Sequence, residues 1–193
     1  ETLCLFQDDP NAKVGLLRGG GERGFCVGAD LTEFGTAPSQ VIARSVRWER
    51  DLWGLFRELR KPIIASLHGY VIGSGIEIAA LCDIRIASDD CKFRMPEIAL
   101  GMIPAAGGTQ TIARLVKASN ALDIILTNRL IFSEQARKIG LVDRVVAVSE
   151  LTDKSKELAK ALSQMDPKVV AAAKRAVIEG SDLELKAGIQ LER

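Results

Sequence analysis

A strand pattern changes to a helix pattern within the segment His68-Gly69-Tyr70-Val71-Ile72-Gly73-Ser74-Gly75-Ile76-Glu77. An apolar run over residues 63–67 precedes this segment, and a helix opened by two glycines is expected to continue to Leu81. The first turn of a helix exposes unpaired backbone N–H groups at the positive end of the helix dipole. Because small residues here let a ligand approach the backbone, the segment is suited to stabilising an anion or a developing oxyanion.

The same residues admit three other interpretations. Ser74 and Glu77 have the spacing of a capping box, in which Glu77 folds back onto the Ser74 N–H that an oxyanion would need. Gly73 and Gly75 after a strand resemble a dinucleotide fingerprint, but Ile78 stands at the third glycine position, where its bulk would obstruct helix–strand packing. The third interpretation is a tight turn without a ligand. The segment by itself leaves these alternatives open.

Strand and helix patterns alternate along most of the chain, which predicts α/β architecture. Short apolar runs indicate strands at residues 13–18, 63–67, 84–87, 92–94 and 141–146. Ser39 is expected to cap one long helix that Pro62 stops. The apolar stripe of that helix comprises Val41, Trp48, Leu52, Leu55 and Leu59. Shorter helices are expected from Thr109 and from Ser133, the second of them ended by Gly140.

Only helical patterns occur from Glu150 onward, with breaks at Asp166-Pro167 and Gly180-Ser181. The sequence therefore predicts an α/β core over residues 1–149 and a helical tail over residues 150–193. The tail carries apolar stripes that are wider than one short helix buries alone. The stripes comprise Leu158, Leu162, Val169 and Val177.

Two further segments could form part of a binding site. Met95-Pro96-Glu97-Ile98 precedes the glycine-rich stretch over residues 101–108. Glu97 fits a first helical turn started by proline, where a carboxylate complements the helix dipole, or a carboxylate held beside a pocket-lining loop. The other segment, residues 25–31, is a strand end followed by a glycine turn, and no G-K-[ST] follows any glycine run, which argues against a Walker-type phosphate loop. His68 is interpreted as a structural histidine at a strand end.

Composition excludes several classes of function. The chain has 193 residues with 47% hydrophobic and 26% charged residues. Its formal net charge of +1 argues against nucleic acid as a partner. No apolar run has the roughly 18–20 residues needed to span a bilayer, and no membrane partner is expected. The single histidine and four cysteines without C-x-x-C spacing indicate no metal site and reduced thiols. The chain opens on Glu1, and we interpret it as a piece of a longer polypeptide.

The order and spacing of these segments resemble the crotonase, or enoyl-CoA hydratase/isomerase, superfamily. The first similar segment is Phe25-Cys26-Val27-Gly28-Ala29-Asp30-Leu31, and the central ones are Lys61 to Ala65, His68 to Glu77 and Cys82 to Ala87. The third block comprises Pro96-Glu97-Ile98, Gly101, Ile103-Pro104 and Gly107-Gly108-Thr109-Gln110, and Ala136 to Asp143 resembles an A-x-x-x-G-L-V-D stretch. The resemblance covers nearly the whole chain.

The resemblance implies a crotonase-like spiral of β-β-α units with a C-terminal helical tail, assembled as a trimer or a dimer of trimers. It implies an enoyl-CoA hydratase that adds water to a 2-enoyl-CoA thioester with Glu77 and Glu97 as the catalytic acids. The backbone N–H groups of Ala29 and Ser74 would form the oxyanion hole. The substrate would be bound by Val27, Gly28, Ala29, Asp30, Leu31 and Ser74. Coenzyme A is then part of the substrate, and neither a separate cofactor nor a metal is expected.

Three departures from the family pattern bear on the acyl group. Ser74 replaces the middle glycine of the usual triple, Ala105 stands where glycine is common, and Met95 stands where glutamine is common. The rival functions are an isomerase of the same fold that uses one glutamate, a non-catalytic or RNA-associated family member, and a dehydrogenase. The expected compartment is the cytoplasm, or the mitochondrial matrix in a eukaryote.

Overall fold

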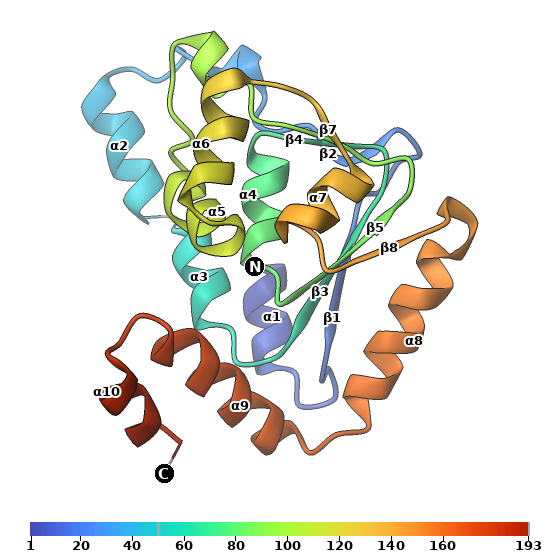
Figure 1. Ribbon diagram of the computed structural model, residues 1–193. Coiled ribbons are helices and arrows are strands. Elements are labelled where there is room, and N and C mark those ends of the chain that lie inside the picture. Colours follow the sequence, from blue (N-terminus) through green and yellow to red (C-terminus); the bar gives the residue numbers. More distant parts are fainter. Residues whose placement is uncertain (50, 193) are drawn as a thin grey trace.

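The computed structural model describes residues 1–49 and 51–192 and has an α/β fold with two sheets and a helical tail (Figure 1). The strands are β1 Gly15–Arg18, β2 Gly24–Cys26, β3 Ile63–Leu67, β4 Tyr70–Ile72, β5 Ile84–Ser88, β6 Lys92–Arg94, β7 Ile131–Phe132 and β8 Arg144–Val146. The α-helices are α1 Thr2–Asp8, α2 Gln40–Glu49, α3 Leu52–Glu58, α4 Ser74–Leu81, α5 Gly108–Val116, α6 Ala118–Thr127, α7 Ser133–Ile139, α8 Leu151–Ser163, α9 Pro167–Gly180 and α10 Leu185–Gln190. Short 3-10 helices cover η1 Leu31–Glu33, η2 Glu97–Leu100 and η3 Val148–Glu150.

The first six strands alternate between the two sheets. One sheet has the order β1-β3-β5-β8 with parallel pairs, and the other has the order β2-β4-β6-β7, in which β7 runs antiparallel to β6. The pairs β1–β2, β3–β4 and β5–β6 each place one strand in each sheet, and helical segments follow each pair. This arrangement confirms the predicted spiral of β-β-α units with a helical tail.

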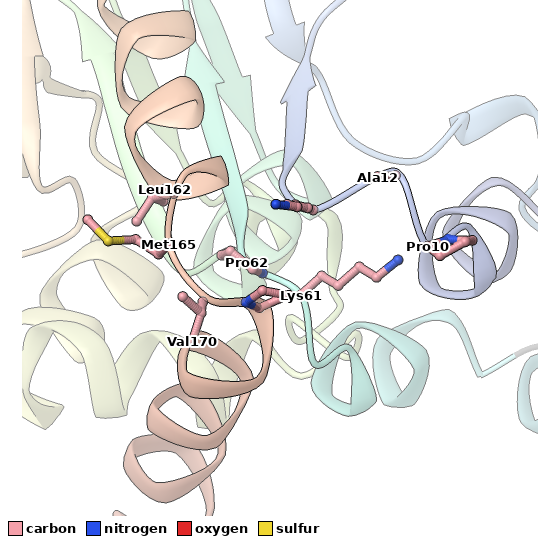
Figure 2. A pocket seen from close by; sticks show the side chains of 9 residues that line it. Pro10, Ala12, Lys61, Pro62, Leu162, Met165 and Val170 are labelled. Atoms are coloured by element: carbon pink, nitrogen blue, oxygen red, sulfur yellow. The ribbon is translucent and has the colours of Figure 1, made fainter.

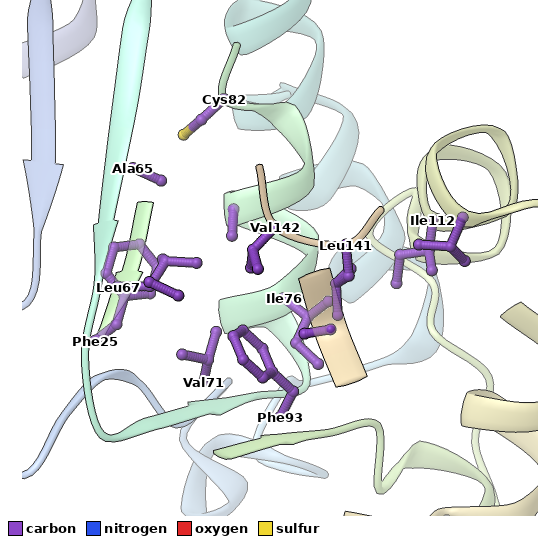
Figure 3. Close-up of a cluster of buried hydrophobic side chains, with 14 of the residues drawn as sticks. Phe25, Ala65, Leu67, Val71, Ile76, Cys82, Phe93, Ile112, Leu141 and Val142 are labelled. Atoms are coloured by element: carbon purple, nitrogen blue, oxygen red, sulfur yellow. The ribbon is translucent and has the colours of Figure 1, made fainter. Parts of the chain in front are cut away.

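The core is built around β3 and α4. All five residues of β3 are buried between β1 and β5, as expected for a central parallel strand whose two faces are both covered. Ile76 on α4 is 1% exposed and packs with Val71 and Phe93 from the second sheet (Figure 3). Truncating such a side chain to alanine typically costs about 2–5 kcal/mol. The core therefore fixes the helix that also carries Glu77.

The prediction of one continuous helix between Ser39 and Pro62 was wrong. The structure divides it into α2 and α3, and residue 50 lies outside the described residues. Of the expected apolar stripe, Val41 is 77% and Trp48 75% exposed, whereas Leu59 is buried. Leu52 is also 44% exposed, so Leu59 is the member of the stripe that belongs to the core cluster. Helix α2 stands apart from the helices that cover the sheets, at the upper left of Figure 1.

The sequence predicted several other elements only in part. The strands at residues 63–67, 84–87 and 92–94 are confirmed, whereas the expected strand at residues 141–146 is confined to β8. The expected buried strand at residues 13–18 is shorter and only half-buried. The sequence indicated β2 only as a strand end at the start of residues 25–31, and it did not predict α6 or the short strands β4 and β7. Periodicity cannot identify runs as short as these strands.

The tail helices pack against the first sheet through polar contacts as well as apolar ones. The Ser155 hydroxyl on α8 donates to the hydroxyl of Ser66 at 3.1 Å, and both residues are buried. On α9, the Lys174 ammonium lies 2.8 Å from the Asp83 carboxylate and donates to the Lys61 carbonyl at 3.0 Å. The helical tail is thus confirmed. The division into separate units at residues 149 and 150 stays a prediction.

A small crevice marks the place where the tail meets the start of β3 (Figure 2). It is lined by Pro10, Ala12, Lys13, Lys61, Pro62, Leu162, Met165, Pro167 and Val170. Its volume of about 50 Å³ holds a few water molecules at most. This crevice is therefore too small to be the site of a nucleotide-bearing substrate.

Candidate active site

Three parallel strands of the second sheet end at one edge and bring distant segments together. Register pairs Cys26 of β2 with Val71 of β4, and Ile72 of β4 with Arg94 of β6. The residues after these strands begin the segments 27–31, 73–77 and 95–97, which held all the predicted site residues. Ligands of parallel α/β sheets bind outside the carboxyl ends of the strands. The sheet thus places the three segments where a substrate site is expected.

The segments that carry the two predicted oxyanion residues run side by side at this edge. A Cβ built on Gly28 would lie 3.7 Å from the Ser74 backbone nitrogen, so the segment containing Ala29 runs beside the start of α4. The predicted CoA-lining segment is open to solvent, with Val27 68% and Leu31 56% exposed. Asp30 caps η1 by accepting from the Thr32 N–H at 2.9 Å. Hydrogen bonds from the Thr32 hydroxyl, at 2.7 Å, and from the Thr32 N–H hold the pKa of Asp30 below its usual value.

The capping-box interpretation of Glu77 is wrong. Ser74 is the first residue of α4, its N-cap is Gly73, and no side-chain cap is present. The carboxylate of Glu77 instead points away from its own helix start, and its Oε1 accepts the N–H groups of Ala106 at 3.1 Å and Gly108 at 2.9 Å. The residue is only 2% exposed. The Ser74 N–H is therefore left free of Glu77, as an oxyanion donor requires.

Glu97 lies against the start of the same helix. Gly73 has φ 54°, a left-handed value that favours glycine, and a Cβ there would be 2.8 Å from Glu97 Oε1. The Oε2 atom of Glu97 is buried, and among the described residues it has no hydrogen-bond partner. Burial raises the pKa of Glu97, its own backbone N–H opposes this change, and the nearby charge of Glu77 raises the pKa further. The structure thus brings the two predicted glutamates together.

The sequence did not predict the donors that hold Glu77. Gly107 has φ 88° and serves as N-cap of α5, so that the next N–H, from Gly108, is directed at the carboxylate. The signal was present in the pair Gly107-Gly108, which was assigned only to a pocket-lining loop. The same loop borders a cleft of about 470 Å³ lined by Trp48, Asp51, Trp53, Ala105, Ala106 and Gly107. Neither tryptophan was identified as a site residue from the sequence.

His68 has a structural contact rather than a place at the edge described above. Its Nε2–H donates to the Gly21 carbonyl at 2.7 Å, because a carbonyl can only accept. Within residues 1–49 and 51–192, no group of three His, Cys, Asp or Glu side chains is positioned to hold a metal ion. None of the helices in that part of the chain is both long and apolar enough to cross a bilayer.

Comparison with known proteins identifies the family. A family model described as enoyl-CoA hydratase/isomerase matches residues 1–193. The chain is 37% identical to a probable mitochondrial enoyl-CoA hydratase of Dictyostelium discoideum, over 100% of this chain and 68% of the relative. It is 35% identical to the (E)-benzylidenesuccinyl-CoA hydratase of Thauera aromatica, over 98% of this chain and 73% of the relative.

Solved structures give the same result. The crystal structure of an enoyl-CoA hydratase from Bacillus anthracis superposes with a TM-score of 0.92 at 34% identity, covering 99% of this chain and 74% of that one. The agreement extends over the sheets, the strand ends and the tail helices, because nearly the whole chain is covered. On the combined evidence of sequence and structure, the chain belongs to the enoyl-CoA hydratase/isomerase family.

Proposed function

We propose that this protein adds water reversibly to the double bond of a 2-enoyl-CoA thioester and forms a 3-hydroxyacyl-CoA. The observation that carries the proposal is that Glu97 lies against Gly73 at the start of α4, close enough to Glu77 in the first turn of that helix that, besides burial, the charge of Glu77 raises the pKa of Glu97. An isomerase that uses one glutamate has no need of a second, whereas hydration requires one proton to be removed and another supplied. Two carboxyl groups at one water molecule can do both.

The environments of the two glutamates suggest their roles. Glu97 has a raised pKa caused first by burial, which favours the protonated form and a role as the general acid. Glu77 accepts two backbone N–H groups through one oxygen, an arrangement suited to a charged carboxylate and a role as the general base. The rule that paired carboxyl groups in different environments take opposite roles supports this assignment.

The proposed reaction balances without an electron carrier. Glu77 takes a proton from water while the water oxygen bonds to C3 of the enoyl group. The π electron pair of the C2–C3 double bond shifts through the conjugated system and leaves the negative charge on the thioester oxygen. The N–H groups of Ala29 and Ser74 stabilise that oxyanion, each donor being worth roughly 100–1,000-fold in rate. Glu97 then supplies a proton to C2, and the thioester carbonyl re-forms. Proton exchange with solvent afterwards removes the proton from Glu77 and returns one to Glu97. No electrons are exchanged, and coenzyme A enters only as part of the substrate.

The coenzyme A portion is assigned to residues 27–31. This segment is exposed and leads directly to the oxyanion position, so the thioester can reach the backbone donors while the nucleotide stays at the surface. Relatives of nearly equal identity are named for a general enoyl group and for a benzylidenesuccinyl group. Family membership therefore leaves the acyl group open.

Isosteric substitution of the two glutamates tests the mechanism. Glu77→Gln and Glu97→Gln keep the size of the side chain and remove its ability to exchange a proton. Each is expected to lower hydration by at least ~100-fold, followed as loss of enoyl absorbance, with binding of the thioester nearly unchanged. The double variant is expected to be little worse than the worse single one, since residues acting as a unit are not additive.

Glu134→Gln is the matched control, because Glu134 pairs with Arg137 on the exposed side of α7. It is expected to leave turnover unchanged. Near wild-type hydration by either site variant would contradict the proposal. If one glutamate is dispensable and solvent deuterium enters the substrate without net addition of water, the protein is an isomerase of the same family.

A further inference from the structure

Both tryptophans of the chain line one cleft. Trp48 lies near the end of α2 and Trp53 near the start of α3, and they face the loop Ala105, Ala106 and Gly107 across a volume of about 470 Å³. Pockets for small molecules generally have volumes of about 300–1,000 Å³. The cleft is thus large enough for an organic group, in contrast to the crevice beside the tail.

The loop wall of this cleft is joined to the proposed catalytic base. The N–H of Ala106 donates to Glu77 Oε1 at 3.1 Å. A group that packs against Ala106 therefore lies beside a residue that contacts the Glu77 carboxylate directly. The opposite wall is fixed at the start of α3, where the Asp51 carboxylate accepts the Gly54 N–H at 2.9 Å and caps the helix. The cleft therefore has one side tied to Glu77 and one side tied to a capped helix start.

The tryptophans are not part of the core. Trp48 is 75% exposed and Trp53 is partly exposed, whereas Phe56 on the same helix as Trp53 is 5% exposed and belongs to the core cluster. The facing loop consists of alanine and glycine, whose small side chains let a flat group approach the backbone. Large aromatic walls opposite small residues form a slot suited to a planar ring.

We propose that Trp48 and Trp53 determine specificity for the acyl group and select enoyl-CoA thioesters that carry an aromatic ring conjugated to the double bond. This inference rests on the proposed hydratase function and names its substrate class. Such an acyl group is planar from the thioester to the ring, so it can lie between the indoles and the loop with C3 near Glu77. A short linear enoyl chain has no ring to pack against the two indoles.

Turnover of two substrates tests the preference. The probes are cinnamoyl-CoA, with a ring, and crotonyl-CoA, with a methyl group. Trp48→Leu and Trp53→Leu are each expected to lower the ratio of kcat/KM for cinnamoyl-CoA over that for crotonyl-CoA by about two- to tenfold, the usual contribution of an aromatic pair. Phe132→Leu, at a 49% exposed aromatic residue on β7, is the control and should leave the ratio unchanged.

Equal losses for both substrates would overturn the preference while leaving the hydratase proposal intact. A wild-type protein that hydrates crotonyl-CoA at least as efficiently as cinnamoyl-CoA would do the same. If neither thioester is hydrated, the proposed function fails first, and the cleft is then tested by binding alone.

Tryptophan fluorescence provides that binding test, because the chain has no tryptophan outside the cleft. The probes are 3-phenylpropanoyl-CoA and butanoyl-CoA, which have no double bond and cannot be hydrated, with coenzyme A as the control. The ring-bearing thioester is expected to change the emission at a lower concentration than butanoyl-CoA, and coenzyme A alone should not change it. Trp48→Phe and Trp53→Phe each leave one reporter in place. Binding of the ring-bearing thioester without any change in emission would show that its acyl group lies elsewhere.

Discussion

Glu77 and Gly108 are joined by a hydrogen bond of 2.9 Å between two helices, from the N–H of the first residue of α5 to the carboxylate on α4. The contact leaves no room for a side chain at Gly108. A Cβ there would lie 2.5 Å from Glu77 Oε1 and 2.9 Å from the Cβ of Pro104. The position of the proposed base therefore depends on a residue that does not itself take part in the reaction.

Gly108→Ala is expected to move Glu77 and so to lower turnover strongly. Misplacing a catalytic group by about 1 Å can cost roughly 100-fold, and we expect a loss of that order in kcat with a smaller change in thioester binding. Gly20→Ala is the control, since a Cβ on Gly20 meets nothing within 4 Å. Steady-state kinetics of both variants measure the effect. Equal activity of the two would show that Glu77 does not depend on this anchor.

The sequence predicted the site segments better than the contacts between them. Glu77, Glu97 and Ser74 were placed by motif order, and the sheet register brings their segments together as the resemblance implied. The pairing of Glu77 with Ala106 and Gly108 was not predicted, because the pair Gly107-Gly108 indicates a tight turn but does not indicate which carboxylate its N–H groups bind. A glutamate three residues past a serine is compatible both with a capping box and with a contact to a distant segment, and only the fold distinguishes the two.

The cleft tryptophans show a second limit of sequence reasoning. Trp48 fits an apolar helical stripe, which favours a core position. The division between α2 and α3 instead leaves it exposed and facing residues 105–107. Periodicity reports which face of a helix is apolar. It cannot report whether that face meets the core or a ligand.

The raised pKa of Glu97 predicts a change of activity with pH. As the proposed acid, Glu97 must be protonated, so kcat/KM should fall as the pH rises through its raised pKa, above the ordinary value of 4.5. The residual activity of Glu97→Gln should lack this decrease. A pH–rate profile of both proteins measures it. An unchanged decrease in Glu97→Gln would assign the titration to another group.

The same shift predicts how the stability of the folded state depends on pH. Because the folded pKa of Glu97 is raised, its contribution to stability is fully present below about 4.5 and is lost as the pH rises through the folded value. Glu97→Gln should therefore gain stability relative to the wild type as the pH rises to neutrality. Urea unfolding of both proteins at about pH 4 and about pH 7.5 tests the sign. A difference that is the same at both pH values would contradict it.

The exposed apolar residues of the tail support the prediction of a trimer or a dimer of trimers. Val169, Val177 and Leu185 on α9 and α10 are 65%, 69% and 81% exposed, and exposed apolar groups of this kind mark interaction surfaces. The double variant Val177→Lys, Leu185→Lys is expected to sediment at a lower mass than the wild type. Val148→Lys, at an exposed valine outside these helices, is the control. A wild-type protein that is monomeric at micromolar concentration would refute the prediction.

The role of the Ser74 N–H can be tested without changing any ionisable group. Ser74 is the first residue of α4, where proline is well tolerated, and Gly73 before it has φ 54° and ψ −120°, outside the α region that a following proline disfavours. Ser74→Pro thus removes the N–H while keeping the helix start. Ser74→Val is the matched control, because it has similar bulk and keeps the N–H.

Loss of one oxyanion donor is expected to lower the turnover of Ser74→Pro by roughly 100–1,000-fold relative to Ser74→Val. Thioester binding should differ little between the two variants, since the donor acts mainly on charge that develops during the reaction. Circular dichroism and urea unfolding check that both variants fold. Equal turnover would remove the Ser74 N–H from the mechanism. The assignments of Glu77 and Glu97 would then rest on their own substitutions, because neither carboxylate accepts a hydrogen bond from Ser74 in the structure.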